Sequence, residues 1–363
     1  MEPVESTRAD SASWRSIAFR LLLSVAALAV AGFVLAHVFD ELDPAEVWRT
    51  LRSLQDAEVV GIASVWMLML GAQGLLTASL IDGLPVRQGI VAFLGPAALA
   101  MVIPGPSDLP LRYRMLVSWG CSSREAGLAI AAGGVFSIGT KLVLPLLAGA
   151  TLLVADVPVA GVGRIIVAAT LFLGIGVASA VIILGSAERT AAVSRGLLEP
   201  IWRITLRLLR RRREETALVD RLLEARAEAL GVLERRWPLA AWASFLTALA
   251  TASLLLLCLR AVDLRAEDIR WTGAFVVFAL VQGITVVPVT AGNAGVAEVG
   301  YVTLLTTLAG PGSVNRVTAA VILFRALTWL LLIPAGAIAL AVWRVGLRRS
   351  LRTQQPEAAG ERL

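Results

Sequence analysis

Long uncharged, largely apolar runs constrain the fold of this 363-residue chain more than any other feature; the clearest are Val59–Ile81, Ile165–Ala187 and Trp237–Leu259. Each has the roughly 20 residues that a helix needs to cross about 30 Å of hydrocarbon. Buried helices of soluble proteins rarely contain such runs longer than about 14 residues. Apolar residues make up 57% of the chain and charged residues only 17%. The sequence therefore predicts an all-α polytopic membrane protein.

Charge differences between the polar segments predict the orientation of the chain in the membrane. Residues 40–58 hold six acidic residues and two arginines, whereas residues 188–236 hold twelve arginines and eight acidic residues. The C-terminal tail adds further arginines, among them Arg344, Arg348, Arg349 and Arg352. Because cytoplasmic loops carry an excess of Lys and Arg, both termini and the 188–236 segment are expected in the cytoplasm.

The predicted organisation has two membrane halves separated by a cytoplasmic insert. About six full transmembrane helices are expected, at about 21–39, 59–81, 125–155, 165–187, 237–259 and 317–343. A cleaved signal peptide is the alternative for 21–39, but the run is long and lacks a small-residue cleavage site. The expected parts are an N-terminal tail (1–20), a first half (21–187), an insert (188–236), a second half (237–343) and a C-terminal tail (344–363).

Two segments interrupt the apolar pattern with proline and glycine, and they resemble each other. In each, a break is followed by an acidic residue and then by a membrane run with one basic residue inside it. Proline removes a backbone donor and glycine permits left-handed backbone, so helices break at such points. The break residues are Pro104 and Gly105 in the first segment, and Pro288, Gly292, Asn293 and Gly295 in the second.

We interpret residues 88–123 and 271–310 as broken, re-entrant hairpins that enter from opposite membrane faces. This is the pattern of an inverted repeat, whose discontinuous helices place a binding site near the midplane. If both hairpins cross the membrane fully, the chain has eight crossings. The number of crossings is then still even, so both termini remain on the same side of the membrane. Chance similarity is the alternative, because the spacings between acid and base differ.

Charged residues beside these breaks predict a polar cavity inside the membrane. They are Asp108, Arg112, Arg114, Lys141, Glu298 and Arg325. A charge at the bilayer centre costs about 2.5–3.5 kcal/mol on insertion scales, so it usually faces a cavity or a partner. A structural salt bridge accounts for Glu298 and Arg325, and a local i, i+4 helix pair accounts for Asp108 and Arg112. Lys141 has no such partner and is the strongest indication of a cavity.

The 188–236 insert contains a basic amphipathic helix. Ile201, Ile204 and Leu208 fall on one helical face, and the other side carries Arg203, Arg207 and Arg210–Arg213. Such a helix suits the surface of an anionic inner leaflet, with a solvated helical hairpin as the alternative. Because the arginines lie beside membrane segments, lipid contact explains the net charge of +6 better than nucleic acid does.

Metal and cofactor chemistry is not indicated. Cys121 and Cys258 are far apart, and the single histidine, His37, has no Cys/His cluster around it. The cysteines are best interpreted as small packing residues, and no metal or cofactor is expected. The high alanine and arginine content favours a bacterial source.

The stretch Val287–Ala337, with Pro288, Gly292, Gly295, Glu298, Arg325 and Gly336, resembles the transmembrane region of lysylphosphatidylglycerol synthases and their flippase-like relatives. Pro104, Asp108 and Arg112 extend the resemblance upstream, and the hydropathy pattern covers about residues 15–345. The family pattern usually reads Pro-Gly-Gly-x-Gly before the glutamate, whereas this chain has Ala-Gly-Asn-Ala-Gly. Asparagine tolerates left-handed geometry, so the turn is expected to survive.

The resemblance implies a multi-pass plasma-membrane protein that moves, or helps to move, lipids between leaflets. In the synthases a soluble C-terminal domain attaches lysine to phosphatidylglycerol. Here about twenty polar residues follow the last apolar run, so we expect that domain to be absent.

The first functional hypothesis is a lipid translocator that is not an enzyme. The cations would neutralise the phosphate of a phospholipid or of a polyprenyl-phosphate lipid through charge-assisted hydrogen bonds. The alternative is a non-catalytic subunit that presents a lipid-linked substrate to a glycosyltransferase or another lipid-modifying enzyme. A membrane-embedded enzyme with Glu298 or Asp108 as base ranks last, because the sequence contains no recognisable nucleophile–base–orienter set.

Overall fold

The computed structural model describes residues 52, 55–102, 107–154, 217–286, 291–293 and 295–360. The predicted helices at 21–39 and 165–187, the basic arginines Arg203, Arg207 and Arg210–Arg213, and the break residues Pro104, Gly105 and Pro288 lie outside these ranges. In the described parts of the chain the regular structure is helical, and no strand occurs. The predicted all-α fold is confirmed for these residues.

The described helices are of two kinds, long and short. The long helices are α3 (Asp56–Ser79), α6 (Ser123–Val154), α10 (Ala217–Arg260) and α14 (Leu332–Gly360). The shorter ones are α4 (Val86–Val102), α5 (Asp108–Ser118), α11 (Trp271–Ile284), α12 (Val296–Ala309) and α13 (Val314–Arg325). Three single turns connect them: η2 (Ala291–Asn293), η3 (Pro311–Ser313) and the π-turn η4 (Ala326–Leu330).

Four described stretches are long and apolar enough to cross a membrane: Asp56–Ser79, Ser123–Leu152, Arg236–Arg260 and Pro311–Leu347. They coincide with the predicted helices at 59–81, 125–155, 237–259 and 317–343. The chain is therefore a multi-pass membrane protein.

Helices α3 and α10 pack against each other in antiparallel directions and define two ends of the bundle. At the C-terminal end of α3, Arg236 of α10 donates a hydrogen bond to the Ser79 carbonyl oxygen at 3.3 Å. Arg236 also forms an ion pair with Asp82, just beyond α3. We call this the Ser79 end. The opposite end, where α10 finishes at Arg260, is the Arg260 end.

Helices α4 and α5 both have their outer termini at the Ser79 end. α4 begins soon after Asp82, and Leu116 near the end of α5 packs in one cluster with Leu80 and Ala240. The indole Nε1 of Trp343 in α14 donates to Ser118 Oγ at 2.8 Å, which places this part of α14 at the same end.

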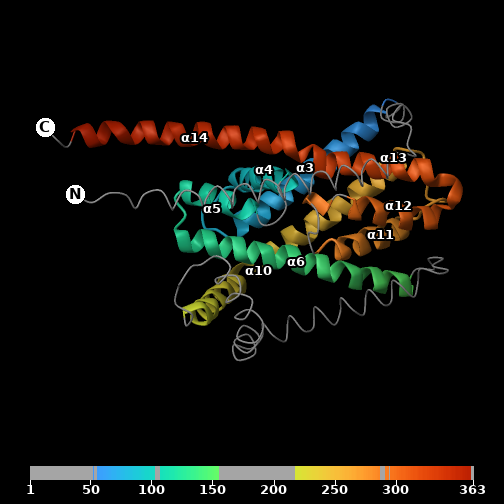
Figure 1. Ribbon diagram of the computed structural model, residues 1–363, viewed down its shortest axis with the longest axis horizontal. Helices are drawn as coiled ribbons and strands as arrows, with labels where there is room; N and C mark the ends of the chain where they lie inside the picture. The colour runs from blue at the N-terminus through green and yellow to red at the C-terminus, as the bar shows by residue number, and fades with distance from the viewer. Residues whose placement is uncertain are drawn as a thin grey trace, which may run out of the picture.

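Helices α11 and α12 have their outer termini at the Arg260 end. Arg260 donates to the carbonyl oxygen of Ile269, two residues before α11, at 2.7 Å. Arg316, which follows α12 and η3, donates to the Asp263 carbonyl oxygen at 3.1 Å. The two pairs of short helices thus lie in opposite halves of the bundle, as Figure 1 shows with α4 and α5 toward one side and α11 and α12 toward the other.

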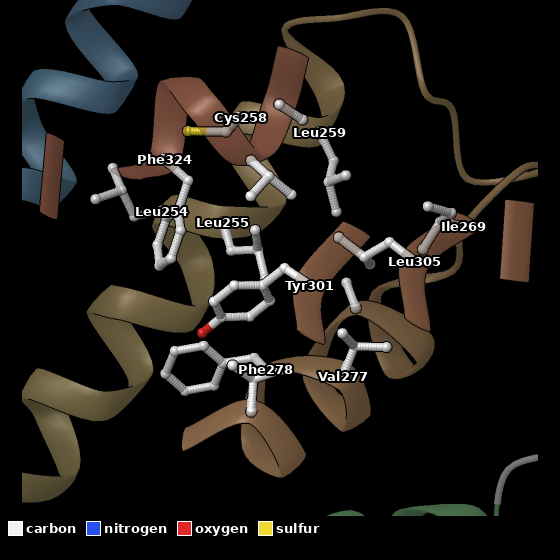
Figure 2. Close-up of a cluster of buried hydrophobic side chains, with 14 of the residues drawn as sticks. Leu254, Leu255, Cys258, Leu259, Ile269, Val277, Phe278, Tyr301, Leu305 and Phe324 are labelled. Atoms are coloured by element: carbon white, nitrogen blue, oxygen red, sulfur yellow. The ribbon is translucent and has the colours of Figure 1, made fainter. Parts of the chain in front are cut away.

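Apolar side chains of α10 to α13 form the largest core, in the Arg260 half. Figure 2 shows the Tyr301 ring in this core, between Phe324 and Phe278. The rings of Tyr301 and Phe324 meet edge to face, with centroids 5.4 Å apart. Such pairs add about 0.5–1.5 kcal/mol to the burial of their area.

Glycines allow α3, α4 and α14 to approach closely. A Cβ at Gly89 of α4 would lie 2.2 Å from the Gly74 carbonyl oxygen of α3. A Cβ at Gly336 of α14 would lie 2.4 Å from the Leu94 carbonyl oxygen of α4. Small residues at such contacts are how helices pack in membranes, where apolar burial between helices contributes little.

Two helices extend beyond the limits expected from hydropathy. α10 does not begin at the expected boundary of 237 but runs unbroken from Ala217, a length of about 66 Å at 1.5 Å per residue. α14 likewise continues past residue 343 to Gly360. Both additions are rich in good helix formers, so the change in polarity ends the apolar span but not the helix. Figure 1 shows both extensions at the Ser79 end.

The helix expected at 317–343 is interrupted directly after Arg325. The Leu331 amide donates to the Ala326 carbonyl oxygen at 2.7 Å, which is the wider hydrogen-bond ring of a π-turn. Pro334 lacks an N–H and its ring would crowd the Leu330 carbonyl, so a regular helix cannot continue through this point.

Candidate functional site

The break between α11 and α12 has a backbone that depends on glycine. Gly292 and Asn293 in η2 have φ values of +59° and +56°, in the left-handed region. A Cβ at Gly292 would lie 2.3 Å from Trp329 Nε1 and 2.9 Å from Met101 Sδ. η2 therefore packs directly against the C-terminal end of α4 and against η4, so that residues beside the two breaks meet.

Arg325 and Glu298 form a buried ion pair next to this break. Arg325 Nε donates to Glu298 Oε1 at 2.5 Å, and the two side chains are 14% and 7% exposed. The other carboxylate oxygen of Glu298 accepts from the Gly295 amide at 2.7 Å, at the N-terminus of α12. Arg325 Nη2 donates to the Gly292 carbonyl oxygen at 2.9 Å, and the guanidinium lies 5.8 Å from the Trp329 ring centroid. The pair thus ties α13 to the break.

A cavity of about 260 Å³ lies beside the pair. Its walls come from the middle of α3, α6 and α10, from the inner ends of α4 and α11, and from η2, α12, α13 and η4. The polar and charged lining residues are Gln73, Ser137, Thr140, Lys141, Ser244, Thr247, Thr251, Gln282, Thr285, Asn293, Tyr301, Arg325 and Thr328. Because the walls include the centres of three membrane-crossing helices, the cavity lies deep between the two ends.

Lys141 lines this cavity from the middle of α6. Its Nζ donates to the Thr285 carbonyl oxygen at 3.4 Å, at the C-terminus of α11. Asn293 Nδ2 donates to the same oxygen at 3.3 Å. A helix C-terminus carries partial negative charge, so it favours the ammonium group. No described acidic side chain forms an ion pair with Lys141.

A second cavity of about 220 Å³ adjoins the first toward the Ser79 end. Asp108 and Arg112 line it, and their side chains form an ion pair at 3.6 Å. Gln73, Phe93 and Ser137 line both cavities. Arg112 Nε is buried and has no hydrogen-bond partner among the described residues.

The structure separates the predicted site residues into three groups. Gly292, Asn293, Lys141 and Arg325 line the first cavity. Glu298 forms the ion pair with Arg325 and accepts a hydrogen bond from the Gly295 amide, and neither Glu298 nor Gly295 is among the lining residues. Asp108 and Arg112 line the second cavity. Arg114 is exposed and lines neither cavity, so it stands apart from the predicted group. Two residues along a helix point in widely different directions, which explains why Arg112 and Arg114 differ.

Neutral polar residues of the cavity were missed by sequence reasoning. Thr247 and Thr251 stand one helical turn apart on α10, and Thr328 and Thr285 face them from η4 and from the end of α11. Residues four apart lie on the same face of a helix, so the spacing of Thr247 and Thr251 indicates a polar face of α10. Trp329 was also missed, although it lies one turn after Arg325.

These features define a class: a helical membrane protein whose broken helices meet beside a buried, charged cavity. The chain belongs to the family of the lysylphosphatidylglycerol synthase TM region, whose model matches residues 21–336. The comparison with curated proteins found no significant match.

Proposed function

We propose that this protein is a lipid translocator that moves a phospholipid or a polyprenyl-phosphate lipid through the cavity at mid-membrane, without catalysing a reaction. The observation that carries the proposal is the position of Lys141 and Arg325 on one polar cavity in the centre of apolar helices. A headgroup phosphate in hydrocarbon would be costly, and the two cations supply hydrogen bonds and charge at that depth.

The adjoining cavities support a stepwise route. A headgroup entering from the Ser79 end would meet Arg112 first and Lys141 next, with Ser137 at the boundary between them. Irregular backbone is tolerated at membrane depth only where it is buried or lines a wet cavity, and η2 lines the first cavity. In this proposal α4–α5 and α11–α12 are re-entrant halves of an inverted repeat that rock about the shared site.

The proposed orientation of the protein in the membrane rests on the positive-inside rule. The extension of α10 before Arg236 and that of α14 after Trp343 lie at the Ser79 end and contain many arginines. We place this end in the cytoplasm of a plasma membrane, where anionic lipids attract basic segments. The arginines at 203, 207 and 210–213 would add to this contact.

The test is lipid translocation in reconstituted liposomes. Fluorescent lipid on the outer leaflet is bleached by an impermeant reductant, so the unbleached fraction reports movement between leaflets. The native protein should accelerate movement well above protein-free vesicles, and Lys141→Gln should slow it about tenfold. Arg87→Gln, which removes an exposed positive charge at the start of α4, is the matched control and should keep the native rate. Equal rates with native protein and with empty vesicles would refute translocation.

A second function is favoured by the two helix extensions at one end. Helices that run beyond the membrane span offer a docking surface to a lipid-modifying enzyme, such as a glycosyltransferase, to which the cavity would present its lipid. Deletion of the gene would then remove a lipid-linked product and leave the lipid asymmetry of the membrane unchanged. A change in asymmetry without loss of such a product would contradict this alternative.

A further inference from the structure

Resting on the proposed function, we infer that Lys141 binds a proton that moves together with the anionic headgroup, so that lipid movement is coupled to a proton gradient. Three features of the described residues carry the inference. They are an ammonium group without a carboxylate partner, a neighbouring cation whose charge is fixed, and a polar route between the two cavities. The protein would then be a proton–lipid symporter, and uncoupled translocation is the alternative.

Lys141 is the cation of the first cavity that can change its charge. Lys141 and Arg325 are the cationic groups among the described lining residues. A guanidinium keeps its proton in proteins, whereas an ammonium group can become a neutral amine. The Arg325 charge is also offset by Glu298, whose Oε1 lies 2.5 Å from Arg325 Nε. The net charge of the cavity and this pair therefore depends on the protonation of Lys141.

The helices around Lys141 hold no acidic group against it. Helix α6 packs against α3, α5, α10 and α11, and the described lining residues from α3, α10 and α11 are neutral. Tyr301 of α12 lines the same cavity with a phenol that is neutral at physiological pH. Asp108 and Arg112 of α5 pair with each other in the second cavity. The bond from Lys141 to the Thr285 carbonyl oxygen can be made by an ammonium group or by an amine, so it does not fix the proton.

Electrostatics favour the movement of the proton and the anion together. An uncompensated charge enclosed by hydrocarbon is costly. When the cavity is empty, a neutral Lys141 leaves only the balanced pair of Arg325 and Glu298. When a headgroup with one negative charge is bound, a protonated Lys141 balances it. Both the empty and the loaded cavity are then without net charge, so one proton accompanies each such headgroup.

The second cavity supplies a route for the proton from the Ser79 end. Its volume of about 220 Å³ is large enough for several water molecules. Asp108 lines this cavity, and Ser137 lines both cavities. Ser137 precedes Lys141 by one helical turn on α6. Acidic residues inside membrane proteins commonly serve in proton relays, and Asp108 and Ser137 are placed to pass a proton toward Lys141.

A pH gradient across reconstituted liposomes tests the coupling. The probe is a trace of acyl-labelled phosphatidylmethanol, whose phosphodiester keeps one negative charge near neutral pH. The interior is made one pH unit more alkaline, and valinomycin with potassium holds the membrane potential at zero. The native protein should enrich the probe in the inner leaflet up to about tenfold, because one proton accompanies each anion. Protein-free vesicles should show no enrichment. Translocation to an equal distribution between the leaflets would overturn the coupling and leave the proposed function standing.

Lys141→Arg separates the positive charge from the exchangeable proton. The variant keeps a cation at the cavity, but its guanidinium does not release a proton. It should therefore move the probe without responding to the pH gradient, and the distribution between leaflets should follow an imposed membrane potential instead. Arg87→Gln, the matched control, should enrich the probe as the native protein does. Native enrichment by Lys141→Arg would show that another group carries the proton and would overturn the assignment.

Proton uptake on lipid binding tests the site without transport. Purified full-length protein in detergent and weak buffer is mixed with phosphatidylmethanol over a range of pH, and a dye records the pH change. The native protein should take up as much as one proton for each lipid bound, because anion binding favours the charged form of Lys141. Lys141→Arg should bind the lipid and take up none. Absence of uptake by the native protein at every pH would overturn the inference. Uptake without translocation in liposomes would sustain the proton site and refute the proposed function.

Discussion

Replacing Glu298 with glutamine should destabilise the protein strongly, because it leaves the Arg325 guanidinium charged and buried. The two side chains are 14% and 7% exposed, so water screens the pair little. Removal of one partner from a buried ion pair typically costs about 3–5 kcal/mol. The carboxylate also accepts the Gly295 amide at the start of α12, and a glutamine retains only one acceptor oxygen for both bonds.

The double variant Glu298→Gln, Arg325→Met should recover most of this loss. It removes both charges and keeps the aliphatic length of the arginine, and replacing a buried pair by neutral groups is often nearly neutral. Residues in direct contact typically show coupling energies of about 0.5–3 kcal/mol. The double variant is therefore expected to be more stable than the Glu298→Gln single variant.

Thermal unfolding can be followed with a fluorogenic thiol reagent, because Cys258 is fully buried in the main core. Cys121, which is partly exposed, is replaced by alanine in every variant. At about 1.3 °C per kcal/mol for a chain of 363 residues, Glu298→Gln should lower the unfolding midpoint by roughly 4–6 °C. A midpoint within 1 °C of the parent, or a double variant as unstable as the sum of the two single variants, would show that the pair is not coupled as described.

Two glycine substitutions test the packing around the cavity. Gly292→Ala places a Cβ 2.3 Å from Trp329 Nε1 at a φ of +59°, and should lower the free energy of unfolding by about 1–3 kcal/mol or more. Gly71→Ala is the control, because no atom lies within 4 Å of the added Cβ, and it should be neutral or slightly stabilising. Gly336→Ala places a Cβ 2.4 Å from the Leu94 carbonyl oxygen and should separate α14 from α4, with a similar loss. Unchanged unfolding midpoints for Gly292→Ala and Gly336→Ala would contradict the close approach of these elements.

Strong local signals made part of the site predictable. Proline and glycine within an apolar run specify a break in almost any context, and a charge in such a run needs a partner. The break at Gly292 and the salt bridge between Glu298 and Arg325 could therefore be read from the sequence. The position of Lys141 beside them depends on how α6 packs against α11, which is a tertiary contact.

Other features carry too weak a signal in the sequence. Serine and threonine occur in membrane helices with hydroxyls bonded to their own backbone, so Thr247 and Thr251 do not stand out as cavity residues. The inward face of α5 is set by its neighbours, so Arg112 and Arg114 could not be separated. A change in polarity predicts a helix boundary near residue 237, whereas α10 continues through this change because its residues favour helix.

Cysteine accessibility tests the central claim, a wet polar cavity between the two ends, most directly. Thr251 lines the cavity, while Leu249 on the same helix is 47% exposed on the outer surface that would face lipid. In a background without Cys121 and Cys258, a small charged thiol reagent should modify Thr251→Cys in liposomes and leave Leu249→Cys unmodified. If Thr251→Cys stays as unreactive as Leu249→Cys, the cavity is closed to water and the account is contradicted.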